Sequence, residues 1–154
     1  MTDNSRALRA ILLGGLIAGT LDITYACVFS YLRRGIRPVV ILQSVAAGAL
    51  GPSAFTGGAK AAALGLAFHF LIATTAAAIY YLASRKLRFM ITRAVVCGIA
   101  YGLCVYGFMN FVVLPLSANP PKWPYPWPAI VGGLLIHMFG IGLPIALITR
   151  KYSK

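Results

Sequence analysis

The chain has 154 residues, of which 60% are hydrophobic and 10% are charged, and its formal net charge is +12. A soluble domain carries about 25% charged residues, so a soluble fold of this length could not cover so much apolar surface, and lipid must cover part of it. The basic residues stand at the ends of apolar runs, which fits contact with anionic headgroups and excludes the basic-aromatic stripe of a nucleic-acid-binding protein.

Four apolar runs are long enough to cross a membrane as helices, since a spanning helix needs about 20 mostly apolar residues. They cover residues 10–32, 61–84, 94–116 and 128–149 and lack the alternation of barrel strands. We therefore predict an all-α membrane protein, a single integral domain over residues 1–154 with four transmembrane helices. The first run follows a polar, basic start and carries Asp22, so we expect a retained first span and no cleaved signal peptide.

Residues 38–59 are also uncharged, but their apolar part is short. Residues 39–50 would rise only about 18 Å as a helix, against a hydrocarbon core of about 30 Å. Gly51, Pro52, Gly57 and Gly58 then favour a turn into the next span. We expect a re-entrant or interfacial helix over about 38–52, and a fifth full span is the alternative.

The distribution of Lys and Arg predicts the orientation. With four spans, the side of the two termini holds the larger set, Arg6, Arg9, Arg85, Lys86, Arg88, Arg93, Arg150, Lys151 and Lys154, and the other side holds Arg33, Arg34, Arg37, Lys60 and Lys122. The positive-inside rule then places both termini in the cytoplasm, as in a bacterial-type inner membrane. The opposite side receives residues 120–128, rich in Pro, Trp and Tyr, which we expect to form a structured cap; a recognition loop is the alternative.

Small residues are spaced for close helix packing in lipid. They are Gly14, Gly15, Ala18 and Gly19, then Gly98 and Gly102, then Gly132, Gly133, Gly140 and Gly142. Such patches predict a helical bundle or a homo-oligomer and carry no chemistry. The three cysteines, Cys27, Cys97 and Cys104, lie inside apolar runs without a CxxC pair, and we interpret them as packing residues.

Four polar side chains interrupt the four spans, one in each: Asp22, His69, Asn110 and His137. Counted from the ends of the spans at about 1.5 Å per residue, all four lie at depths of about 10–15 Å below the outer face. An ionised carboxylate at that depth is costly, so Asp22 must be protonated, paired or in contact with water. If the four side chains face inward, they form one candidate ligand or ion site.

Several roles are open to such a site. The role that we favour from the sequence is a structural polar core of Asp22, His69, Asn110 and His137 in a multi-pass packing or accessory membrane protein, whose biochemical function the sequence does not show. The alternatives are a small proton- or ion-coupled transporter or channel that uses Asp22 and the histidines, and a subunit that binds haem or a divalent metal through His69 and His137. No catalytic, phosphate-loop or GxSxG motif is present, so we expect neither an enzyme nor an obligatory cofactor.

A weak internal repeat relates the two halves. Gly65 to His69 matches Gly133 to His137, and Gly19-xx-Asp22 matches Gly107-xx-Asn110. Two helices per half would give parallel repeats about an axis along the membrane normal. Chance similarity in a Gly- and Leu-rich sequence is the alternative.

The second half carries a further set of features: His69 with Tyr80-Tyr81, Gly98-xxx-Gly102, Asn110-xxxx-Pro115, Pro120-Pro121 with Trp123, and a last span with Gly133 and His137. In these features the chain resembles the YagU-like group of small bacterial inner-membrane proteins over roughly residues 65–148. The resemblance implies a multi-pass inner-membrane protein and brings no reaction or ligand. A His is usual in that group where this sequence has Asn110.

Overall fold

The computed structural model describes residues 3–120 and 125–153 of the chain, and in this part every regular element is a helix. Lys122, Trp123 and Lys154, used above for the orientation and the cap, lie outside the described residues. The elements in chain order are α1 (Asp3–Arg34), α2 (Pro38–Leu50), the 3₁₀ helix η1 (Gly51–Thr56), α3 (Gly58–Lys86), α4 (Phe89–Thr92), α5 (Ala94–Phe108), the π-helical η2 (Met109–Val113), α6 (Trp127–Leu135), the π-helical η3 (Ile136–Gly142) and α7 (Leu143–Tyr152).

Five helical stretches are long and apolar enough to cross a membrane, where the sequence predicts four and a shorter segment. The additional stretch is Pro38–Thr56, which joins α2 and η1. α2 ends at Leu50, where Gly51 takes a positive φ of 69°, but the 3₁₀ helix η1 follows directly, so helical structure continues past the end expected near residue 52. The described chain is therefore an all-helical protein with five helices of membrane-spanning length and composition.

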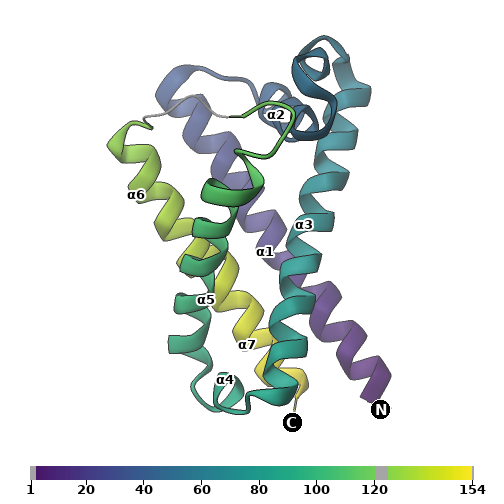
Figure 1. Cartoon of the computed structure of the whole chain (residues 1–154), viewed down its shortest axis with the longest axis vertical. Coiled ribbons are helices and arrows are strands. Elements are labelled where there is room, and N and C mark those ends of the chain that lie inside the picture. Colours follow the sequence, from purple (N-terminus) through teal and green to yellow (C-terminus); the bar gives the residue numbers. More distant parts are fainter. Residues whose placement is uncertain (1–2, 121–124, 154) are drawn as a thin grey trace.

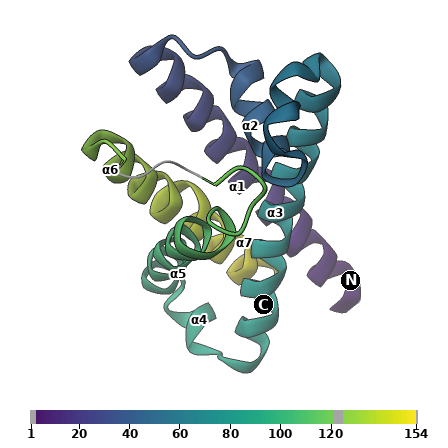
Figure 2. The same ribbon diagram turned by 45° about the horizontal axis from the view of Figure 1, so that its top comes forward.

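The helices form a bundle with two distinct ends (Figure 1). Both termini and α4 lie at one end, whereas α2, η1, the described residues after η2 and the start of α6 lie at the other. When the bundle is turned so that this second end comes forward, α5 and α6 stand on one side and α2 and α3 on the other (Figure 2). α1 packs along α3 and also against η3 and α7, so it joins the two sides.

Small residues make these contacts close. Gly15 of α1 lies so near α3 that a Cβ atom there would be 2.5 Å from Cα of Thr74. Gly102 of α5 lies directly against the backbone of His137, and Gly142 lies directly against Gly98 and Gly102. The expected small-residue patches thus pack helices of the same chain together, which suits an environment where association depends on van der Waals contact.

The outer surface is apolar along the helices and basic at the ends. Exposed large side chains include Leu32, Leu71, Val96 and Phe111, each at least 64% exposed. In water this would be an aggregating surface, whereas hydrocarbon covers it at no cost. Near the termini, Arg85 of α3 lies 4.0 Å from Asp3 of α1, and both side chains are exposed, so the pair adds little stability.

Candidate functional site

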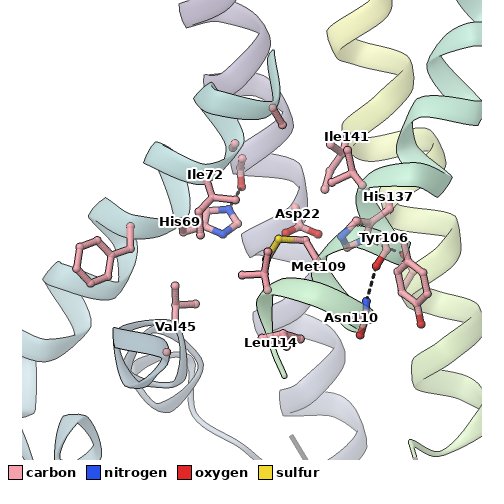
Figure 3. Close-up of a pocket in the computed structure, with 18 of the residues that line it drawn as sticks. Asp22, Val45, His69, Ile72, Tyr106, Met109, Asn110, Leu114, His137 and Ile141 are labelled. Atoms are coloured by element: carbon pink, nitrogen blue, oxygen red, sulfur yellow. Dashed lines mark hydrogen bonds between the residues drawn. The ribbon is translucent and has the colours of Figure 1, made fainter. Parts of the chain in front are cut away.

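A cavity of about 650 Å³ lies inside the bundle and runs toward the end that carries α2. Asp22, His69, Asn110 and His137 all line it, together with many apolar side chains. Figure 3 shows Asp22 between His69 and His137, with Met109 beside them. The structure therefore brings the four polar side chains, each from a different span, to one cavity.

The cavity ends at a tightly packed half of the bundle. Ala18, Ala73 and Ile141 line the end of the cavity that is nearer to the two termini. Ala18 and Ile141 also belong to a buried apolar cluster with Ala77, Tyr80, Ala94, Ile145 and Ala146. At the opposite rim, the N–H of Ala118 donates a 2.8 Å hydrogen bond to the carbonyl of Gly48 and joins the segment after η2 to α2. The cavity is thus one-sided, closed toward the termini and lined at its far end by α2.

Asp22 lies on the floor of the cavity without a hydrogen bond or ion pair to any residue in 3–120 or 125–153, and its side chain is only half-buried. Its charge acts on the nearby rings of His137 and Tyr25 through space only. A carboxylate in an apolar surrounding is costly unless a cation, a proton or water satisfies it. This residue is therefore the strongest electrostatic feature of the cavity.

Each histidine uses one ring nitrogen on a backbone carbonyl. Nε2 of His69 lies 2.8 Å from the carbonyl oxygen of Gly19, across the α1–α3 interface, and Nδ1 of His137 lies 2.9 Å from that of Gly133, within its own helix. Because a carbonyl oxygen only accepts, these nitrogens carry the protons. In the neutral rings Nδ1 of His69 and Nε2 of His137 are then left as acceptors.

Asn110 is buried and completes the floor. Its Nδ2 donates a 2.9 Å hydrogen bond to the carbonyl of Tyr106, which leaves the amide oxygen as an acceptor without a donor from the described residues. With the carboxylate and the two free imidazole nitrogens, the floor offers hydrogen-bond acceptors from four helices. An acceptor set of this kind suits a ligand that donates hydrogen bonds or carries positive charge.

Two of these residues lie in π-helical segments, Asn110 in η2 and His137 in η3. Pro115 follows η2 and Pro144 follows η3 within one turn. A proline cannot donate to the carbonyl four residues earlier and its ring crowds that carbonyl, so the preceding turn widens. The sequence contains this signal, but the expected plain helices over 94–116 and 128–149 do not use it.

The three ionisable side chains do not form a ligand set for one metal ion in this arrangement. Among the described residues, no group of three or more His, Cys, Asp or Glu side chains lies close enough to hold a metal. The hydrogen bonds to Gly19 and Gly133 use only one ring nitrogen of each histidine, so it is the distance between the side chains, and not these bonds, that keeps them from forming a ligand set.

The hydrogen bonds of the two histidines do not follow the internal repeat that the sequence indicates. His69 binds the glycine of Gly19-xx-Asp22 on the neighbouring span, whereas His137 binds Gly133 and leaves Gly107, the matching glycine, without this contact. The two halves share an order of helices but use their histidines differently.

The two histidines should differ in their effect on stability. We expect His69→Phe to lower the free energy of unfolding by about 1 kcal/mol more than His137→Phe, because only His69 joins two helices by its hydrogen bond. Thermal unfolding of both variants in one detergent measures this. Equal losses would mean that the contact between His69 and Gly19 contributes nothing to helix association.

Comparisons with known proteins give no relative. No protein-family model, no curated protein and no solved structure matches the chain. The resemblance to the YagU-like group therefore stays a prediction from the sequence.

Proposed function

We propose that this protein is a small transporter in which Asp22 exchanges a proton for a cationic ligand on the floor of the cavity. The observation that carries the proposal is the carboxylate of Asp22, which has no hydrogen bond or ion pair with a described residue, in a largely apolar cavity where His69, Asn110 and His137 also leave acceptor atoms free. A purely structural polar core is less well supported, because His69, Asn110 and His137 bond to backbone carbonyls and not to Asp22 or to one another.

For the membrane topology we propose four spans, with α2 and η1 as a re-entrant or interfacial segment. α2 rises only about 20 Å over its 13 residues, and the positive φ of Gly51 interrupts it before η1. The position of α2 beside the C-terminal end of α1 and the N-terminal end of α3 supports this topology (Figure 1). In a five-span topology the two termini would lie on opposite sides.

For the orientation we propose that both termini face the cytoplasm of a bacterial-type inner membrane. Eight of the described Lys and Arg residues lie at the end with the termini and α4: Arg6, Arg9, Arg85, Lys86, Arg88, Arg93, Arg150 and Lys151. The far end holds Arg33, Arg34, Arg37 and Lys60. Anionic lipid headgroups would hold the basic end at the inner surface, and the cavity would then extend toward the outer face.

Competition between proton and cation tests the function. Octylamine is protonated from acidic to neutral pH, so it serves as the cationic probe. Added to detergent-purified protein in a weakly buffered acidic solution with a pH-indicator dye, it should bind and release protons from Asp22. Octanoate, which has the same chain and a negative head, should release none and should not raise the melting temperature.

Two results would contradict this function. One is that octylamine neither releases protons nor raises the melting temperature at any pH. The other is that the release is unchanged in Asp22→Asn, since the proton would then come from another group. Either result would return Asp22 and the histidines to a structural role.

A further inference from the structure

A second cavity, the α3–α5 groove, lies on the outside of the bundle. Its volume is about 500 Å³, and it is lined by Leu71, Ile72, Thr75, Ala76, Ile79, Tyr101, Cys104, Val105, Phe108, Met109 and Val113. These residues come only from α3, α5 and η2, and below the groove α3 and α5 meet at the edge-to-face rings of Tyr80 and Tyr101, whose centroids are 5.0 Å apart. Tyr101 closes the groove below by donating a 2.7 Å hydrogen bond to the carbonyl of Ala76.

The groove and the polar cavity share a wall. Six side chains line both: Leu71, Ile72, Ala76, Val105, Met109 and Val113. Figure 3 shows Met109 and Ile72 beside His69 and Asp22. Met109 has three rotatable bonds and no branch, so it can move aside without strain. The wall between the groove and the acceptor floor is therefore apolar, thin and movable.

The groove is placed where a membrane supplies apolar chains. Leu71 is 64% exposed and Phe108 is 59% exposed at its edges, and both lie well inside spanning helices. Apart from Thr75, Tyr101 and Cys104, its lining is aliphatic, aromatic or thioether, and it carries no charge. Water has few partners there, whereas an acyl or alkyl chain fits the surface.

From these observations we propose that the α3–α5 groove is a lateral portal, through which an amphiphile with a protonated amine head and one apolar chain reaches Asp22 from the bilayer. The inference rests on the proposed function, because Asp22 must hold the cation. The amine donates to the acceptor floor, and its chain passes the wall at Met109 and lies in the groove. The substrate class is thus a lipophilic amine dissolved in the membrane and not a small ion from water.

Cys104 offers a reporter inside the groove, since it is exposed and lines it. In a Cys27→Ala/Cys97→Ala background, Cys104 is labelled with bimane and the protein is placed in lipid vesicles. The matched control carries Cys104→Ala and Leu103→Cys, because Leu103 is the neighbouring residue, is exposed and lines neither cavity. The quencher is an alkylamine with a nitroxide on its chain, and a fatty acid with the same chain and nitroxide is the anionic control.

We expect the amine to quench bimane at Cys104 several-fold more than bimane at position 103, and Asp22→Asn to reduce the signal at Cys104 to that of the control. The fatty acid should quench both positions alike. Equal quenching by the amine at both positions would overturn the portal, as would strong quenching that Asp22→Asn leaves unchanged. A second copy of the chain seated on the groove would also give weak quenching at Cys104 and would overturn it.

The two proposals can fail separately. If octylamine releases protons through Asp22 but the labelled amine does not favour Cys104, the cation site stands and the ligand arrives from the α2 end of the cavity. If neither signal is seen, the transporter function fails together with the portal.

Discussion

In the Asp22→Asn variant, octylamine should bind about 100-fold more weakly, a loss of ~2.8 kcal/mol, and its binding should release no protons. The physical reason is that Asp22 is the only acidic residue lining the cavity, and no described residue pairs with it. An ammonium group loses its hydration in an apolar cavity, and the negative charge of Asp22 offsets most of that cost, whereas neutral acceptors offset only part of it. Asparagine keeps the size of the side chain and offers only a neutral acceptor.

The sequence provides a matched control, since it contains one further acid, Asp3. Asp3→Asn changes the net charge by the same amount but acts at the exposed pair with Arg85, far from the cavity. It should leave octylamine binding unchanged. Asp22→Glu should keep most of the proton release, because the charge is retained. Calorimetric titration in one detergent measures all three variants, and equal affinity in Asp22→Asn and Asp3→Asn would reject the cation site.

A single methyl group at Gly102 should destabilise the bundle strongly, because backbone atoms of a neighbouring helix fill the space that it would need. The added Cβ of Gly102→Ala would overlap the carbonyl of His137 and lie 2.7 Å from Cα of Met138. Backbone atoms cannot turn away as a side chain can, so α5 and η3 must separate. We expect a loss of about 3 kcal/mol in the free energy of unfolding, at the upper end for overpacking.

Gly107→Ala is the matched control for this prediction. Gly107 is also on α5, but nothing lies within 4 Å of a Cβ at that position. Since alanine favours a helix by up to about 1 kcal/mol over glycine, this variant should be neutral or more stable. Thermal unfolding compares the two variants directly. Gly102→Ala should also weaken octylamine binding, because the separation moves His137; a stable Gly102→Ala variant with normal binding would contradict the close packing.

Much of this architecture can be predicted from the sequence, because lipid permits few solutions. The helical class follows from composition, and the polar residues can be placed at one depth by counting from the ends of the spans. The length of the Pro38–Thr56 stretch could not be predicted, since Gly51 and Pro52 are typical both of a turn and of the start of a 3₁₀ helix. Which of these the backbone adopts depends on tertiary contacts, such as that between Ala118 and Gly48.

The sequence predicts which four residues form the site, but it does not predict which of their atoms are free to bind a ligand. Counting residues from the ends of the spans places His69 and His137 at one depth in the membrane. It does not show which ring nitrogen of each histidine is left without a hydrogen bond. That choice depends on Gly19 of another helix and Gly133 of the same helix. Met109 was also missed, since a methionine in an apolar run carries no signal of its own. Met109 gains a role only in the structure, where its side chain lines both the polar cavity and the α3–α5 groove.

The π-helical turns also change which residues of these spans share one face of the helix. A π turn holds one residue more than an α turn, so the faces of the helix beyond it are rotated by about 100° relative to an unbroken α-helix. A wheel drawn with a constant period through residues 127–152 therefore assigns the wrong face to every residue on one side of η3, and one drawn through residues 94–113 misplaces the residues of η2 itself. A cysteine scan along either span should show this as a break in the phase of labelling, at residues 109–113 in one and 136–142 in the other.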